Sequence, residues 1–193
     1  MTDPTIETAD RSGTRALLVV DVQNDFCEGG SLAVEGGHEV AEKVSELIAS
    51  DHDYALVVAS RDWHEPHSSN GGHFDEWPVH CVQDSTGSDY APGFDTSGVD
   101  LHVRKGQGVP AYSAFEGVTD EGTALADVLR ERGITDVDVC GIATDHCVRA
   151  SAVDAAKEGF GVRLLDGLHV GVAEDTVASA LDEMRAAGVV MTQ

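Results

Sequence analysis

The sequence predicts an α/β fold, a doubly wound, Rossmann-like and mostly parallel six-stranded sheet flanked by helices in three α/β/α layers. Short apolar and β-branched runs alternate along the chain with segments whose apolar residues recur at helical spacing. The runs are continuous rather than alternating, which is typical of strands buried on both faces of a parallel sheet. Strands that alternate with helices favour right-handed crossovers within one such sheet.

The six predicted strands cover residues 15–20, 54–59, 101–104, 137–139, 160–165 and 189–191. Helical spacing predicts helices over residues 38–50, 123–132, 147–158 and 174–187. Residues 60–97 show little periodicity but are rich in His, Trp and Pro, and so long a loop in a compact domain indicates a functional segment. We expect a disordered or frayed N-terminus over residues 1–14 and one domain over residues 15–193.

Charge excludes some classes of partner. The 12 Lys and Arg face 35 Asp and Glu, a net charge of −23, which disfavours nucleic acid and anionic membranes as partners. The acidic residues are spread along the chain and lysine is scarce, as on proteins from a high-salt cytoplasm. The chain shows neither a secretory leader nor an apolar run long enough to cross a bilayer, so we expect a soluble, cytoplasmic protein.

The four cysteines are not expected to form disulfides in a reducing compartment, and no Cys-x-x-Cys pair supports a thiolate zinc site. Cys147 stands out because it follows a predicted strand and a turn that carries Thr144 and Asp145, both good N-cap residues. This position places Cys147 in the first turn of a helix, where unpaired N–H groups and the helix dipole favour a thiolate. The alternative is a small buried hydrophobic residue, and position alone does not decide between them.

Two further side chains follow predicted strands. Asp21 comes directly after the first strand and Lys105 after the third, so both lie at the carboxyl edge of the sheet with Cys147. Separately, each has an ordinary explanation, Asp21 as a turn residue and Lys105 as a solvated cation. Together, a thiol, a carboxylate that takes its proton and an ammonium group form a coherent nucleophilic site.

The long loop carries a candidate metal site. Asp62 and His64 form an Asp-x-His pair whose side chains share a face in extended chain, and His80 is the natural third ligand. Two imidazoles and a carboxylate suit Zn²⁺ or Fe²⁺. The alternative interpretation is that these histidines are solvated loop residues that bind no metal. A fourth ligand from His67, from His73 or from neither fits the spacing, and we take His67 as the candidate.

Six segments together resemble the nicotinamidases, the pyrazinamide-hydrolysing branch of the isochorismatase-like cysteine hydrolases. They are VDVQNDF at 20–26, RDWH at 61–64, WPVHC at 77–81, RKG at 104–106, YSAFEG at 112–117 and GIATDHCV at 141–148. None is diagnostic alone, but their order and joint presence are specific, and the resemblance covers residues 15–192 almost without a break.

The resemblance implies a role for each candidate residue. Asp21 would be the base, Lys105 its electrostatic partner and Cys147 the nucleophile. The metal of this family (zinc, iron or manganese, with zinc our expectation) would contact the pyridine nitrogen and be held by Asp62, His64 and His80. Phe26 and Trp77 match the aromatic walls of the substrate site, and Tyr112 matches a pocket-lining residue. The Ile142–Ala143 bond matches the family's cis peptide, which would aim the N–H groups of Ala143 and Cys147 at an oxyanion.

The implied reaction is the deamidation of nicotinamide to nicotinate and ammonia through a Cys147 thioester, a step of NAD salvage, and of pyrazinamide likewise. Within the family, a carbamoyl or ureido substrate is the alternative, although those branches typically lack the Asp62, His64 and His80 set. The isochorismatase branch is disfavoured because it lacks the cysteine. A further alternative is a non-catalytic metal-binding or interaction module. Under that hypothesis, the common edge position of Asp21, Lys105 and Cys147 would be a coincidence. Whether the protein is a monomer or a homo-oligomer stays open.

Overall fold

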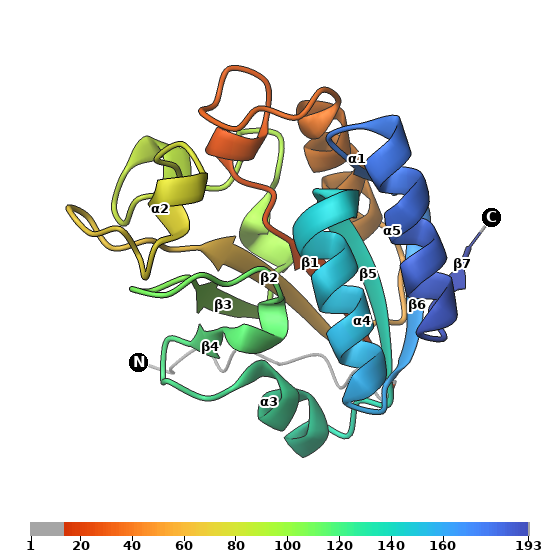
Figure 1. Ribbon diagram of the computed structural model, residues 1–193. Coiled ribbons are helices and arrows are strands. Elements are labelled where there is room, and N and C mark those ends of the chain that lie inside the picture. Colours follow the sequence, from red (N-terminus) through yellow and green to blue (C-terminus); the bar gives the residue numbers. More distant parts are fainter. Residues whose placement is uncertain (1–13, 193) are drawn as a thin grey trace, which may run out of the picture.

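The computed structural model describes residues 14–192 and is built around a seven-stranded sheet in the order β4-β3-β2-β1-β5-β6-β7 (Figure 1). The strands are β1 Arg15–Val20, β2 Leu56–Asp62, β3 Leu101–Lys105, β4 Val118–Thr119, β5 Asp136–Ile142, β6 Gly161–Val170 and β7 Val190–Met191. All neighbouring strands pair in parallel except β4, which is antiparallel to β3 at one edge. The predicted α/β class and mostly parallel sheet are confirmed.

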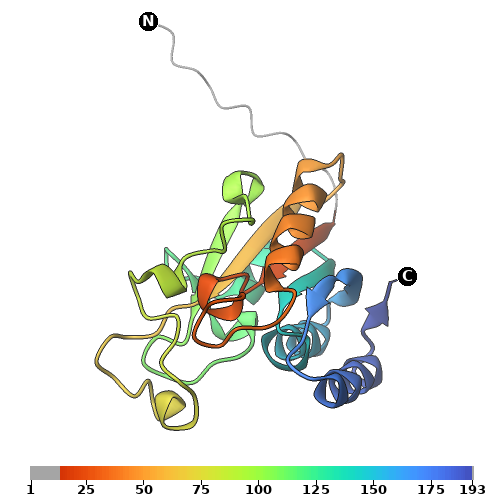
Figure 2. The ribbon, with the colours of Figure 1, turned by 90° about the horizontal axis from the view of Figure 1, so that it is seen from above.

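The helices are α1 Gly37–Ala49, α2 His73–Glu76, α3 Leu125–Glu131, α4 Arg149–Lys157 and α5 Glu174–Ala186. The view from above shows the sheet between α1 on one side and α4 and α5 on the other (Figure 2). Alternate residues of β1 enter separate cores, Leu18 on the side of α3, α4 and α5, and Leu17 on the side of α1. Burial on both faces explains why β1 is a continuous apolar run.

The strand order explains where a site can form. From the central strand β1 the chain continues into β2 and β3 on one side, and it returns to the other side of β1 with β5. The carboxyl ends of β1 and β5 therefore border the point where the direction of winding reverses, and ligands of open α/β sheets bind in this crevice.

Several predicted boundaries were wrong. The sheet has a seventh strand, since β4 is too short, at two residues, to show any periodicity. Strand β2 continues to Asp62, beyond the predicted end at residue 59. The helix predicted from residue 147 is preceded by a π-helical turn, Thr144–Val148, and α4 begins only at Arg149.

The frayed terminus predicted for residues 1–14 falls, except for Thr14, outside the described residues. The Thr14 carbonyl accepts hydrogen bonds from the backbone N–H groups of Thr135 and Asp136. Within residues 14–192, none of the helices is both long enough and apolar enough to cross a membrane.

Candidate active site

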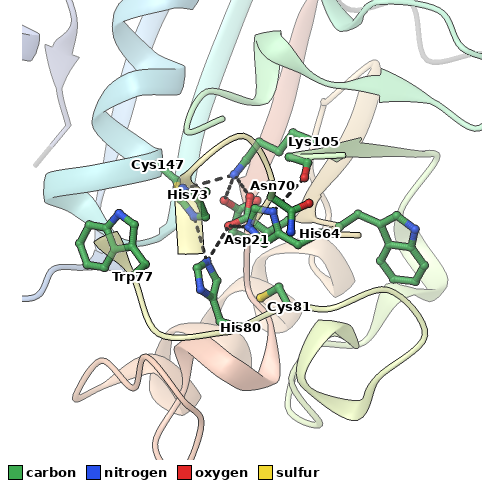
Figure 3. Close-up of polar contacts among 12 residues, drawn as sticks. Asp21, His64, Asn70, His73, Trp77, His80, Cys81, Lys105 and Cys147 are labelled. Atoms are coloured by element: carbon green, nitrogen blue, oxygen red, sulfur yellow. Dashed lines mark hydrogen bonds and ion pairs between the residues drawn. The ribbon is translucent and has the colours of Figure 1, made fainter. Parts of the chain in front are cut away.

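Three residues from different strand ends meet at the carboxyl edge of the sheet. Asp21 follows β1, Lys105 is the last residue of β3, and Cys147 lies in the π-helical turn after β5. The Lys105 Nζ atom lies 2.8 Å from Asp21 Oδ2 and 3.6 Å from Cys147 Sγ. All three side chains are buried, and Figure 3 shows them converging.

Lys105 also forms an ion pair with Asp62, so one buried cation is shared by two carboxylates. Burial alone would lower the pKa of Lys105, but Asp21 and Asp62 hold it well above its usual value. Burial raises the pKa of Asp21, although the charge of Lys105 opposes that shift. Burial acts in the same direction on Asp62, yet Lys105 and the neighbouring histidines hold its pKa well below its usual value. The two carboxyl groups are thus separated in acidity, with Asp21 the one suited to accept a proton.

Position alone left two interpretations of Cys147 open, a thiolate at a helix terminus and a small buried residue. Burial raises the pKa of this thiol well above its usual value, and the cation of Lys105 offsets only part of that rise. Asp21 and Asp62 add to the rise because two negative charges disfavour a third. The resting nucleophile is therefore a thiol that needs a base next to it.

Ser60, which no sequence pattern singles out, fixes the orientation of Asp21. The Ser60 hydroxyl donates a 2.7 Å hydrogen bond to Asp21 Oδ1 from the neighbouring strand β2. Asp21 itself has a left-handed backbone, with φ of 47°, a conformation that Asp tolerates better than most residues. Its carboxylate is therefore held from both oxygens, by Ser60 and by Lys105.

A second cluster consists of histidines. His64, His73 and His80 are buried and place their ring nitrogens within 4.8 Å of one another. His64 Nδ1 lies 2.8 Å from the Gly106 carbonyl and His80 Nδ1 lies 2.7 Å from the Pro78 carbonyl. A carbonyl only accepts, so both Nδ1 atoms carry a proton, and in the neutral imidazole Nε2 is then the atom with the free lone pair.

This cluster fits a divalent metal ion. Asp62 Oδ2 lies 3.7 Å from the Nε2 atoms of both His64 and His80, and the Nε2 atoms of His73 and His80 are 3.4 Å apart. His64 Nε2 is buried and has no hydrogen-bond partner within the described residues. Imidazoles that donate Nδ1–H to a carbonyl and present Nε2 to a common point are typical of metal ligands. A Cβ at Gly106 would lie 2.6 Å from His64 Cε1, so the close approach needs glycine there.

The structure does not bring His67, the candidate fourth ligand, into this cluster. His67 is exposed, whereas His73 lies in the cluster. The reason is local, because Gly71 and Gly72 both have positive φ and turn the chain so that α2 begins at His73 with its side chain directed inward. Residue spacing alone did not distinguish the two histidines.

A cavity of about 310 Å³ opens onto both clusters. The predicted aromatic residues Phe26, Trp77 and Tyr112 line it, together with Asp62 and Cys147. Trp77 Nε1 donates a 2.9 Å hydrogen bond to the Tyr112 hydroxyl, which joins two parts of the wall.

The rest of the cavity wall combines predicted and unpredicted residues. Ile142 and Ala143 line the cavity, and the peptide bond between them is cis. The cavity is also lined by residues 31–34, His146 and Val172, which no sequence pattern singled out. His146 contacts Trp77 edge to face, with ring centroids 5.5 Å apart.

Residues 15–193 match the family model described as the isochorismatase domain. The chain belongs to the isochorismatase family. A nicotinamidase/pyrazinamidase from Mycobacterium tuberculosis is 49% identical over 179 residues, which cover 91% of this chain and 96% of that protein.

Two solved structures also resemble the chain. PnC1 from L. infantum in complex with nicotinate has a TM-score of 0.85 and 36% identity, and the match covers 94% of this chain and 93% of that one. The pyrazinamidase of Pyrococcus horikoshii in complex with zinc has a TM-score of 0.82 and 39% identity, covering 94% and 99% of the two chains. The residues that match the family model include the buried cysteine, carboxylate and lysine at the sheet edge.

Proposed function

We propose that this chain is a metal-containing cysteine amidohydrolase that converts nicotinamide into nicotinate and ammonia, and that also deamidates pyrazinamide. One observation carries the proposal, namely a buried thiol next to an Asp–Lys ion pair in a cavity that also exposes a histidine cluster. The cavity is small and has aromatic walls, which suits a flat heteroaromatic amide.

The chain's own residues supply the covalent chemistry. The Cys147 thiol transfers its proton to Asp21 while Sγ attacks the amide carbonyl, giving a tetrahedral intermediate. Asp21 returns that proton to the departing nitrogen, so that ammonia leaves and a thioester remains. A water molecule then gives a proton to Asp21 and its hydroxide adds to the thioester. The C–S bond breaks, and the proton on Asp21 returns to sulfur.

Lys105 stabilises the two buried carboxylates by its charge. Its buried cation lies against both Asp21 and Asp62 and within 3.6 Å of Cys147 Sγ, where negative charge develops during attack. In a buried site a fixed charge acts strongly because solvent does not screen it.

Asp62, His64, His73 and His80 would hold the metal, and three imidazoles with one carboxylate favour zinc over iron or manganese in this proposal. Zinc would supply a Lewis acid for the lone pair of the ring nitrogen, which orients the substrate. Phe26 and Trp77 would sandwich the ring so that its carboxamide points toward Cys147. Nicotinamide is then the small-molecule partner, and a cytoplasmic location is part of the proposal.

The experiment measures ammonia release from nicotinamide in molar KCl with the protein as isolated, after chelation, and after Zn²⁺, Fe²⁺ or Mn²⁺ is restored. We expect activity to vanish on chelation and to return with metal. Activity that is indifferent to chelation would remove the metal from the proposal but keep the cysteine hydrolase. Folded protein that releases no ammonia would overturn the substrate assignment and direct the test to carbamoyl and ureido compounds.

The Cys147→Ala variant is the matched control for the chemistry. We expect it to lose turnover and to retain the metal content of the wild type, because Cys147 is not part of the histidine cluster. Ammonia release by this variant would contradict the role of Cys147.

A further inference from the structure

The segment that follows β1 forms hydrogen bonds with the backbone at two of the four candidate metal ligands. One set is to Asp62 itself, and the other is to Cys81, which follows His80. Strands β1 and β2 pair as far as Val19 and Ala59. Beyond this rung β1 ends, because Asp21 turns away with its left-handed backbone. Three residues further along β2, Asp62 would therefore have unpaired main-chain groups on the β1 side.

The side chain of Gln23 takes the place of the missing strand. Its Oε1 accepts a 2.8 Å hydrogen bond from Asp62 N, and its Nε2 donates a 3.0 Å hydrogen bond to Asp62 O. The second Nε2 proton goes to the Ser88 carbonyl, also at 3.0 Å. Gln23 is fully buried, so the amide reproduces one rung of the sheet and binds both main-chain groups of Asp62 on the β1 side.

Asp25 plays the corresponding part for His80. Its Oδ2 accepts a 2.7 Å hydrogen bond from Cys81 N, the residue directly after the ligand, and Cys81 has a left-handed backbone with φ of 44°. Gly87 leaves the space for this carboxylate, since a Cβ there would lie 2.1 Å from Asp25 Oδ2. Cys81 also accepts a hydrogen bond from His64 N through its carbonyl, so the same link reaches a second ligand.

We propose that Gln23 and Asp25 are positioning residues that set the spacing of the metal ligands without touching the metal, Gln23 through the backbone of Asp62 and Asp25 through the backbone of Cys81. The inference rests on the metal site of the proposed function. Residues that orient metal ligands typically change metal affinity by about 10- to 100-fold when they are mutated.

The test is a titration of metal-free, full-length protein with Zn²⁺ alone in competition with a chromophoric chelator. Gln23→Met keeps the length of the side chain but removes all three hydrogen bonds. We expect it to weaken zinc binding by roughly 10- to 100-fold. The absorption spectrum of the Co²⁺-loaded variant should also differ from that of the wild type, because that spectrum reports ligand geometry.

Asn24 provides the matched control. It lies between the two positioning residues, and its Nδ2 donates a 2.7 Å hydrogen bond to the Thr86 carbonyl, yet it contacts none of the four ligands. Asn24→Ala should keep the zinc affinity and the Co²⁺ spectrum of the wild type even where its melting temperature falls. A merely structural role for this segment would instead make affinity follow stability in all variants.

A second pair of variants serves if Gln23→Met does not fold. Asp25→Ser should weaken zinc binding, whereas Asp25→Asn keeps an oxygen for Cys81 N and should restore most of the affinity. Wild-type affinity in Gln23→Met, or in Asp25→Ser where the first variant does not fold, would overturn this inference and leave the proposed function intact. A wild-type protein that binds no zinc, iron or manganese would overturn the metal assignment as well.

Discussion

The carboxylate of Asp62 joins Lys105 to the histidine cluster. One oxygen forms an ion pair with Lys105 Nζ, while the other lies 3.7 Å from Nε2 of His64 and of His80. The nucleophile side and the metal side of the cavity therefore share one buried side chain. A change on either side is expected to reach the other through Asp62.

Lys105→Met should destabilise the protein. It leaves Asp21 and Asp62 buried without their cation, and breaking a buried ion pair typically costs about 3 to 5 kcal/mol. Urea denaturation at neutral pH checks this, with Lys157→Met as the control, since Lys157 is exposed and its ion pair with Asp154 lies at the surface. Equal unfolding free energies for the two variants would contradict the structural importance of the buried pair.

Ser60→Ala should lower kcat and leave KM nearly unchanged, because Ser60 holds the base and does not line the cavity. A hydrogen bond to a charged group contributes about 1.5 to 3 kcal/mol, which corresponds to a decrease of roughly 10- to 100-fold. Steady-state kinetics on nicotinamide measure it. Ser45→Ala is the control, because the Ser45 hydroxyl bonds to the carbonyls of Ala41 and Gly93, away from the site. A variant with wild-type kcat would show that Asp21 needs no second support.

Tyr112→Phe should raise KM with little effect on kcat. The change removes the hydroxyl that accepts from Trp77 Nε1 and keeps the ring in the cavity wall. A neutral hydrogen bond contributes about 0.5 to 1.5 kcal/mol, so the expected rise is roughly 2- to 10-fold. An unchanged KM would show that Trp77 is held in place by its other contacts.

His169 should make stability depend on pH. Burial lowers the pKa of His169, whose Nδ1 lies 2.7 Å from the Thr144 hydroxyl in the turn that carries Cys147. The unfolded chain therefore binds more protons than the folded chain below the ordinary histidine pKa of about 6.5. The unfolding free energy should decrease as the pH falls through that value. His169→Asn keeps an acceptor near Nδ1 but does not titrate, so its unfolding free energy should decrease less between pH 7.5 and 5.5 than that of the wild type.

Salt should stabilise the protein. The net charge of −23 opposes the compact state by self-repulsion, and salt screens that repulsion. We expect the melting temperature to rise between 0.1 and 2 M KCl, and the rise to shrink at acidic pH, where carboxylates become protonated. The same rise at both pH values would point to a general salting-out effect instead.

Much of this architecture could be predicted because it follows from local patterns. Continuous apolar runs identified six of the seven strands, and the polar residues at their carboxyl ends identified Asp21, Lys105 and Cys147 as neighbours. The residues that sequence patterns left open or did not assign act through geometry. His73 reaches the cluster because two glycines turn the chain before it, and Gln23 reaches Asp62 because β1 ends early. Neither event leaves a periodic signal in the sequence.

For a related reason, position in the sequence could not decide between a thiolate and a buried thiol at Cys147. Proximity to a helix terminus is visible in the sequence, whereas full burial beside two carboxylates is a property of the folded sheet. The cost of desolvating a charge then outweighs the helix dipole, which contributes far less.

Asp21, Lys105 and the nucleophile Cys147 come from the ends of β1, β3 and β5. The candidate metal ligands, in contrast, all lie between Asp62 and His80. Contacts between distant parts of a chain form late and slowly because long loops must close first. The thiol, base and cation can meet only after three separate strands have paired. Recovery of turnover during refolding therefore reports the pairing of these strands, while metal capture by so short a stretch of chain can precede it.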